Sequence, residues 1–188
     1  MARKRVGQIP DKPRRGLVLV LTGDGKGKTT SCLGMAVRAV GYGMRVSMIQ
    51  FIKGSLHYGE IDGAKRLAPE FELIPMGKGF VGIRGDTLPF EEHVAAAKKA
   101  LAVARKKMLS GRYDVIILDE VNVALHLGLL ELDEVLSLVR EKPPAVHLLL
   151  SGRNAHGEIV RLAHLVTEMR NIKHPYELGF EAEKGIDY

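Results

Sequence analysis

Short continuous runs of hydrophobic residues recur along the chain, and between them lie segments whose hydrophobic positions have helical spacing. Such runs are typical of strands buried on both faces of a parallel sheet. The pattern predicts strands at residues 17–21, 45–52, 71–75, 115–118, 146–150 and 165–169. It predicts helices at residues 29–40, 59–67, 90–109, 132–140 and 158–163. Strands that alternate with helices favour an α/β sandwich with a mostly parallel sheet.

Two segments depart from this alternation. Residues 1–16 hold a cluster of basic side chains and no hydrophobic periodicity, so we predict a mobile, solvated arm there and one domain over residues 17–188. A nucleic-acid contact is the alternative reading of the arm. Residues 76–89 carry glycines at a spacing that no regular element tolerates. We predict a long loop that covers a ligand, with plain surface disorder as the alternative.

Composition restricts the partners and the compartment. The net charge of +6 and the pI near 9.5 favour anionic partners, either nucleotides or nucleic acid. Aromatic residues make up only 5% of the chain and do not gather beside the basic arm, which makes nucleic acid the weaker expectation. No apolar run is long enough for a membrane span and no signal peptide is visible, so we expect a cytoplasmic protein. The single Cys32 excludes an internal disulfide and is expected to be a small buried residue.

The segment TGDGKGKTT, residues 22–30, lies between a predicted buried strand and a predicted helix. It resembles the phosphate-binding pattern G-x-x-x-x-G-K-[ST] but is one residue shorter. Glycines allow successive backbone N–H groups to turn toward an anion, and a helix N-terminus adds partial positive charge. The loop therefore predicts a nucleoside triphosphate site with these members: Gly23, Asp24, Gly25, Lys26, Gly27, Lys28, Thr29 and Thr30.

A second motif, DVIILDE, places Asp119 and Glu120 at the end of a buried strand. An acidic strand end is the usual partner of a phosphate loop, where it binds or orients Mg²⁺ or Mn²⁺ together with the loop hydroxyl. We therefore predict a metal site at Thr29, Asp119 and Glu120, and a catalytic role for Lys28, Thr29 and Glu120. These parts alone leave hydrolysis, phosphoryl transfer and nucleoside transfer open.

The seven histidines show no HExxH or other metal-binding spacing. His126 and His147 lie in apolar surroundings and are expected to be structural. His156 and His174 lie in polar segments, where either of them could contact a substrate.

Taken together, six segments resemble the ATP:corrinoid adenosyltransferases over nearly the whole chain, from about Gly16 to Tyr188. They are the shortened loop, AVRAVGYG (36–43), QFIKG (50–54), YGE (58–60), DVIILDE, and the C-terminal stretch from SGRNAHGEIVRL to KGIDY. The resemblance implies a RecA-like P-loop NTPase fold, a three-layer α/β sandwich, and a homodimer. It also implies transfer of the 5′-deoxyadenosyl group of ATP to a Co(I) corrinoid, with release of tripolyphosphate, in adenosylcobalamin biosynthesis or salvage.

The resemblance assigns further residues by position. It places Arg38 and Arg153 near ATP, and five residues near the corrinoid: Gln50, Lys53, Glu60, Phe80 and His156. It makes cobalt the nucleophile, so no protein base is required, and it implies a flavoprotein as a source of electrons. One departure concerns the loop that reads Gly79-Phe80-Val81-Gly82, where many relatives have Gly-Phe-Thr-Trp. The missing Trp puts the preferred corrinoid in question.

Three rival functions use the same loop. A P-loop kinase or ligase would transfer the γ-phosphate and release ADP. A RecA-like ATPase would bind nucleic acid with strong salt dependence. A nucleotide-binding protein without catalysis is the third alternative.

Overall fold

The computed structural model describes residues 15–54, 57–82 and 86–188. Most of the predicted basic arm, residues 1–14, lies outside the described residues. Six strands form one sheet in the order β3-β2-β4-β5-β1-β6, and each neighbouring pair is parallel. Their bounds are β1 Val18–Thr22, β2 Val46–Gln50, β3 Phe71–Pro75, β4 Val115–Asp119, β5 His147–Ser151 and β6 Leu165–Glu168.

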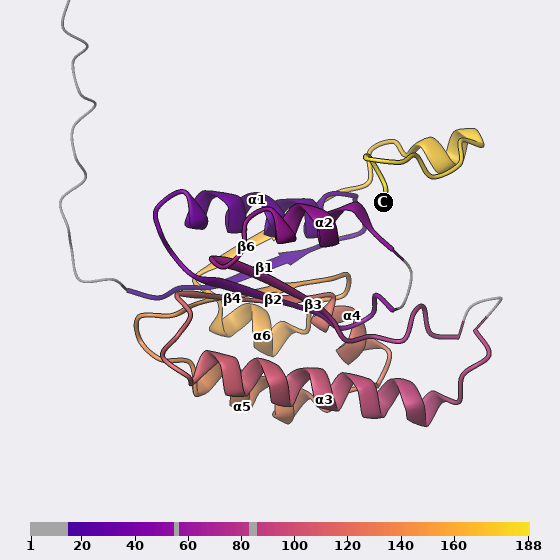
Figure 1. The fold of residues 1–188 in the computed structure, drawn as a ribbon. Coiled ribbons are helices and arrows are strands. Elements are labelled where there is room, and N and C mark those ends of the chain that lie inside the picture. The colour runs from indigo at the N-terminus through magenta and orange to yellow at the C-terminus, as the bar shows by residue number, and fades with distance from the viewer. Residues whose placement is uncertain (1–14, 55–56, 83–85) are drawn as a thin grey trace, which may run out of the picture.

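Helices cover both faces of this sheet and give three layers (Figure 1). One face carries α1 (Lys28–Val40) and α2 (Gly59–Lys65). The other face carries α3 (Phe90–Met108), α4 (Val121–His126), α5 (Leu132–Arg140) and α6 (Gly157–Leu162). The predicted three-layer α/β sandwich is therefore confirmed. Within the described ranges, no helix is both long enough and apolar enough to cross a membrane.

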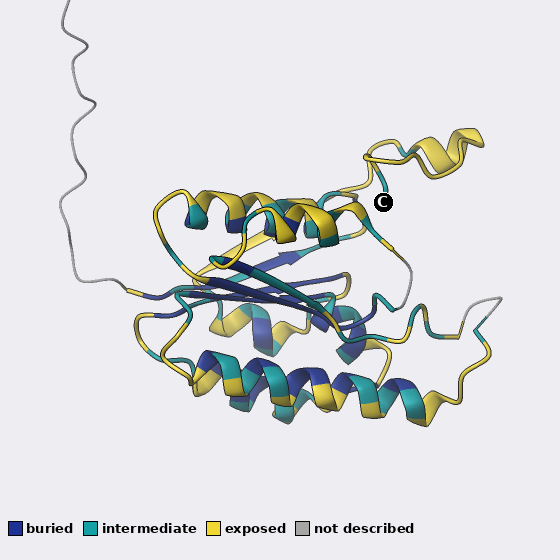
Figure 2. Cartoon of the chain, viewed as in Figure 1, coloured by how far each residue is buried: buried dark blue, intermediate teal, exposed yellow. Residues whose placement is uncertain are grey.

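The core consists of two hydrophobic clusters, one on each side of the sheet (Figure 2). Alternate residues of each strand enter opposite clusters, as the period of two requires. In β2, for example, Met48 packs toward α1 while Ile49 packs toward α3. Cys32 is completely buried in the α1 cluster, as predicted, and burial raises the pKa of its thiol. This packing fixes both the loop before α1 and the acidic end of β4.

The predicted strands and helices are all present, with boundaries that shift by a few residues. The sequence pattern missed α4, because a six-residue helix spans fewer than two turns and shows no usable periodicity. It also missed the short 3₁₀-helix η1 (Pro175–Leu178) in the C-terminal segment. In the described part of the predicted loop 76–89, there is no helix or strand, in agreement with the prediction.

The parallel arrangement determines where a site can form. The carboxyl ends of parallel strands lie at one edge of a sheet, and ligands bind in the crevice outside that edge. Here β1, β2, β4 and β5 end at Thr22, Gln50, Asp119 and Ser151. Polar residues of four strands therefore gather beside the glycine-rich loop.

Candidate functional site

The glycine-rich loop connects β1 to α1 and has the backbone shape of an anion site. Gly23 and Gly27 have φ values of 92° and 114°, which favour glycine. A Cβ on Gly23 would lie 2.4 Å from the Met169 carbonyl oxygen, so the segment after β6 also requires glycine there. No side chain caps the first turn of α1 at Gly27. The N–H groups of that turn are thus available to a phosphate.

Lys28 folds back into the loop. Its Nζ donates hydrogen bonds to the carbonyl oxygens of Gly23 and Gly25, at 2.7 and 2.8 Å. Burial, which leaves Lys28 only 7% exposed, lowers the pKa of its ammonium group. The Lys28 ammonium group is therefore already held inside the loop. To contact a phosphate, it has only to exchange a carbonyl oxygen of the loop for a phosphate oxygen.

Asp119 is the buried centre of a hydrogen-bond network. Its Oδ1 accepts from the Thr29 hydroxyl at 3.0 Å and from the Ser151 hydroxyl at 2.7 Å. Its Oδ2 accepts from Gln50 Nε2 at 3.1 Å. Burial raises the pKa of this carboxyl, and the three hydrogen bonds act in the opposite direction. The structure thus brings Thr29 and Asp119 together, as the two motifs predicted.

Glu120 follows Asp119 and, unlike it, lines the cavity. Burial, with the neighbouring Asp119 charge, raises the pKa of its carboxyl. Within the described part of the chain, no hydrogen bond reaches this carboxylate, and no group of three or more His, Cys, Asp or Glu side chains is placed to hold a metal ion. A cation beside Glu120 would therefore also need the Thr29 hydroxyl and oxygen atoms of a bound nucleotide as ligands.

A second wall is formed by the end of β2 and the start of α2. Lys53 makes an ion pair with Glu60, and its Nζ lies 4.2 Å from the ring centroid of Tyr58. Gln50 Nε2 also reaches Glu60 Oε1 at 3.4 Å. Burial opposes ionisation of Glu60, but the hydrogen bond and charge of Lys53 hold the pKa of this carboxyl below its usual value. The wall therefore presents a fixed charge pair to the cavity.

These parts surround one cavity of about 1200 Å³. One side is the phosphate loop with Glu120 and Arg153, whose Nη2 donates to the Asp24 carbonyl oxygen at 3.3 Å. The lining also includes the charge pair Lys53–Glu60 and the apolar side chains of Ile52, Phe80 and Leu88. The cavity therefore combines an anion-binding end with an end suited to a large, partly apolar ligand.

Most of the predicted site residues line this cavity. They are Asp24, Gly25, Lys26, Gly27, Lys28, Thr29, Thr30, Lys53, Glu60, Phe80, Glu120 and Arg153. Five predicted residues do not line the cavity. Gly23 and Asp119 lie next to the lining, where they accept hydrogen bonds from Lys28 and Thr29. Arg38 is exposed in the last turn of α1, roughly 15 Å along the helix axis from Lys28. Gln50 is buried behind Asp119, and His156 caps α6 by accepting from the Glu158 N–H at 3.2 Å.

Two features of the site were missed. Ser151, at the end of β5, contacts both acidic residues, and its signal was a polar residue closing an apolar strand. The chain end, residues 185–188, also lines the cavity, where Asp187 pairs with Lys26. The sequence marked that end only through KGIDY, without a role. Of the two histidines in polar segments, His174 lines the cavity. His147, which was predicted to be structural, accepts a hydrogen bond from the Leu17 N–H.

Comparison with known proteins places this geometry in a family. A family model described as ATP:corrinoid adenosyltransferase BtuR/CobO/CobP matches residues 14–188. The corrinoid adenosyltransferase of Pseudomonas aeruginosa is 37% identical over 185 residues, which cover 98% of this chain and 89% of the relative. The corrinoid adenosyltransferase of Escherichia coli K12 is also 37% identical, over 98% of this chain and 90% of its own.

The solved structure of the flagellar accessory protein FlaH from Methanocaldococcus jannaschii is similar in fold. It has a TM-score of 0.52 at 12% identity and covers 82% of this chain and 71% of that chain. This likeness concerns the α/β fold alone. The family match and the two relatives extend over the phosphate loop, the acidic strand and the C-terminal segment. The chain belongs to the ATP:corrinoid adenosyltransferase family.

Proposed function

We propose that this protein transfers the 5′-deoxyadenosyl group of ATP to the Co(I) of a reduced corrinoid, in adenosylcobalamin biosynthesis or salvage. Family membership supports this activity. The strongest structural support is one cavity of about 1200 Å³ that is lined both by the glycine-rich loop and by the apolar side chains of Ile52, Phe80 and Leu88. Pockets that bind one drug-sized ligand typically have volumes of about 300–1,000 Å³. The space therefore accommodates a nucleotide and part of a second, larger substrate.

The reaction explains why no protein base is needed. An electron pair of Co(I) forms the bond from cobalt to the ribose 5′-carbon, while the bond from that carbon to oxygen breaks and tripolyphosphate leaves with the bonding pair. Because cobalt is the nucleophile, the protein has to hold and neutralise a highly charged leaving group. The positive charges at the binding position are Lys26 and Lys28 of the loop itself and Arg153, which contacts the loop at Asp24.

Thr29 and Glu120 are suited to hold Mg²⁺ or Mn²⁺, with Asp119 behind them. All three provide oxygen atoms, which these hard cations prefer. The Thr29 hydroxyl gives its hydrogen to Asp119, so the lone pairs of its oxygen stay available to a cation. When bound, the cation would neutralise part of the negative charge on the leaving tripolyphosphate.

The corrinoid is assigned to the wall opposite the loop. Phe80 is 60% exposed there and offers a flat apolar surface, while Lys53 and Glu60 offer polar contacts to the side chains of the ring. Gly82 takes the position where many relatives have Trp, so Phe80 is the aromatic residue that remains in the motif Gly79–Gly82. This arrangement favours a corrinoid held by fewer aromatic contacts than in those relatives.

A homodimer and a cytoplasmic location are part of the proposal. Edge strand β6 is exposed at all four residues, although strands of parallel sheets are normally buried on both faces. Leu165 and Val166 are both 42% exposed, so a second copy would cover an apolar edge. The single Cys32 fits a reducing compartment. A flavoprotein is a suitable donor for the electrons that make Co(I).

The test is an anaerobic assay with MgATP and chemically reduced cob(I)alamin, followed by the corrin absorbance. The expected result is a light-sensitive alkylcobalamin spectrum that requires both ATP and protein. An unchanged corrin spectrum together with ADP formation would support the kinase alternative and contradict adenosyl transfer.

A further inference from the structure

Ser151 is the one residue, in the described part of the chain, whose side chain contacts both acidic residues of the site. Its hydroxyl donates to Asp119 Oδ1 at 2.7 Å, and its oxygen accepts from the Glu120 backbone N–H at 2.9 Å. A serine hydroxyl has one hydrogen and two lone pairs, so both bonds form at the same time. Ser151 is itself completely buried, at the end of β5.

The bond to Glu120 acts on an unusual backbone. Glu120 has φ 62° and ψ 21°, the left-handed region that non-glycine residues rarely adopt. This conformation turns the chain from β4 into α4, and it directs the Glu120 side chain to the cavity while Asp119 remains buried. A strained residue of this kind persists only where its surroundings hold it, and the Ser151 hydroxyl is a direct contact to its N–H.

We propose that Ser151 is a positioning residue that fixes Asp119 and Glu120 relative to each other and thereby sets the metal dependence of ATP binding. This inference rests on the proposed function for the identity of the nucleotide and the cation. Ser151 does not line the cavity, so it acts through the two acids and not by direct contact with a ligand.

The remaining contacts show why this effect is separable from folding. Without the Ser151 hydroxyl, Asp119 keeps its hydrogen bonds from Thr29 and Gln50. Glu120, by contrast, loses the acceptor of its N–H. Ser151→Ala should therefore leave the sheet intact and loosen the side chain that faces the cation. Loss of a residue that supports metal ligands typically costs about 10- to 100-fold in metal affinity.

The experiment measures equilibrium binding of ATP without corrinoid, once in EDTA and once in saturating Mg²⁺. The ratio of the two dissociation constants is the metal enhancement. Ser151→Ala should bind ATP in EDTA within about twofold of the unchanged protein and lose about tenfold of the enhancement. Ser151→Thr keeps the hydroxyl and should restore most of it. The matched control is Ser47→Ala, which removes an equally buried hydroxyl from the other end of the same sheet.

Full metal enhancement in Ser151→Ala, or an equal loss in Ser47→Ala, would overturn the inference. If Ser151→Ala does not fold, Ser151→Cys takes its place, because a thiol fills similar space but hydrogen-bonds weakly. The assay contains no corrinoid, so its outcome is independent of adenosyl transfer. A metal effect without transfer would contradict the proposed function alone.

Discussion

At the residue scale, the site is held ready by side chains that already use protein acceptors. Lys28 donates to two carbonyl oxygens of its own loop, and Thr29 donates to Asp119. Glu120 differs from them because its carboxylate has no hydrogen bond within the described ranges. ATP would therefore redirect one cation and engage one free carboxylate, while the buried network behind them stays in place. This preorganisation is what electrostatic stabilisation of a leaving group requires.

Lys28→Ala should lower kcat/KM for ATP by about 10²- to 10³-fold, as removal of one charged contact to a leaving group typically does. The measurement is steady-state adenosyl transfer at saturating corrinoid. Lys142→Ala is the matched control. Like Lys28, Lys142 donates hydrogen bonds to backbone carbonyl oxygens, but it lies near the amino ends of β1 and β5, away from the site. Near-full activity of Lys28→Ala would remove the loop assignment.

Glu120→Gln should raise the Mg²⁺ concentration needed for half-maximal activity by about tenfold or more, because the amide keeps the shape but loses the charge that a cation needs. A magnesium titration at constant ATP measures this shift. Glu91→Gln, on the exposed first turn of α3, is the control. A superimposable titration for Glu120→Gln would exclude Glu120 from the metal site.

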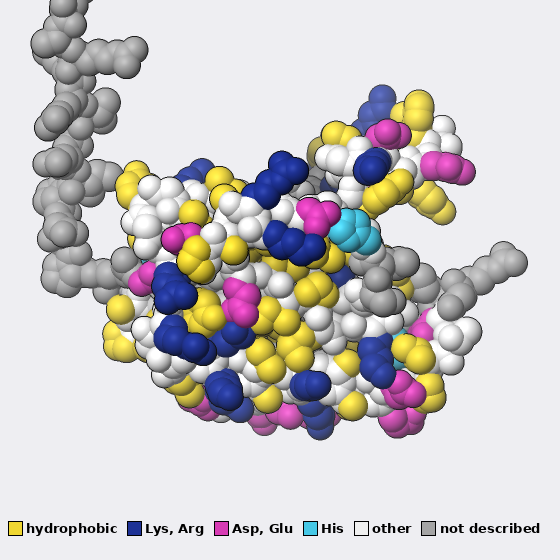
Figure 3. All heavy atoms as spheres, viewed as in Figure 1, with side chains coloured by type: hydrophobic (Ala, Val, Ile, Leu, Met, Phe, Trp, Pro, Cys, Tyr) yellow, Lys and Arg dark blue, Asp and Glu magenta, His cyan; other side chains and the backbone are white. Residues whose placement is uncertain are grey.

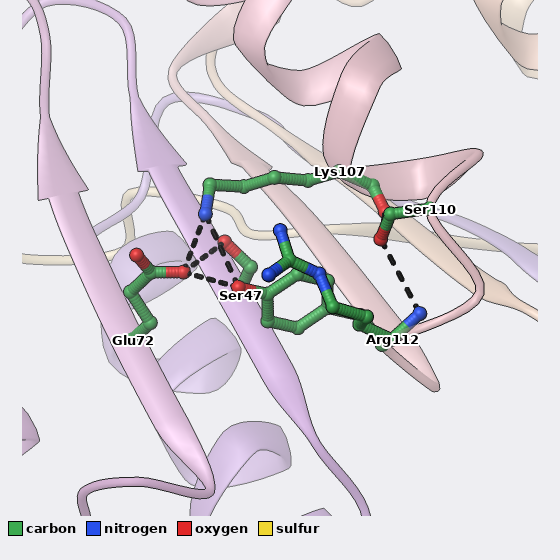
Figure 4. Close-up of polar contacts among 6 residues, drawn as sticks. Ser47, Glu72, Lys107, Ser110 and Arg112 are labelled. Atoms are coloured by element: carbon green, nitrogen blue, oxygen red, sulfur yellow. Dashed lines mark hydrogen bonds and ion pairs between the residues drawn. The ribbon is translucent and has the colours of Figure 1, made fainter.

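At the element scale, the end of the sheet remote from the site has its own polar junction (Figure 4). Glu72 on β3 accepts from Lys107 of α3 and from the Tyr113 hydroxyl, both at 2.6 Å, and Ser47 of β2 lies at the limit of contact. The junction ties α3 and the segment before β4 to the edge of the sheet. Burial alone would raise the pKa of Glu72, but the bonds from Lys107 and Tyr113 hold it below the usual value.

Glu72→Gln should therefore lower stability at neutral pH and leave activity unchanged. Because the folded-state pKa of Glu72 is lowered, its contribution is complete above the ordinary glutamate pKa of about 4.3 and is lost as the pH falls through the folded value. The side chain is partly exposed, so we expect a difference of about 1 kcal/mol or less. Urea unfolding at pH 7 and near pH 3 measures it. A difference that grows toward low pH would contradict the sign.

The same scale shows what sequence reasoning can and cannot reach. The strands and long helices follow from hydrophobic periodicity, and the phosphate loop follows from its position between β1 and α1. Helix α4 did not follow, because its start depends on the left-handed backbone of Glu120, which tertiary contacts with Ser151 support. The position of a residue in a family motif also does not establish that its side chain faces the cavity. Gln50 and His156 bond within the protein, and Arg38 lies at the far end of its helix.

At the scale of the whole molecule, the chain end returns to its beginning. After β6 the chain leaves the body, forms η1 and comes back so that the C-terminus lies near α2 (Figure 1). Asp187 then pairs with Lys26 of the phosphate loop, 161 residues earlier. On the face shown in Figure 3, basic, acidic and hydrophobic side chains are mixed over the body, so this face offers no basic track for nucleic acid.

Asp187→Asn should lower the KM for ATP by about two- to fivefold, because Lys26 no longer has to leave a carboxylate before it contacts a phosphate. Exposed ion pairs are weak, which keeps the effect small. Glu181→Gln removes a charge from the same exposed segment and serves as the control. A higher KM in Asp187→Asn alone would instead identify the chain end as a clamp over bound ATP.

The most direct measurement is ³¹P NMR of the phosphate products after anaerobic reaction of the protein with MgATP and cob(I)alamin. We predict intact tripolyphosphate, formed in a one-to-one ratio with the cobalt alkyl product, because the bond that breaks is the one between the ribose 5′-carbon and oxygen. ADP and inorganic phosphate in place of tripolyphosphate would show that the loop serves γ-phosphate chemistry, and would contradict adenosyl transfer.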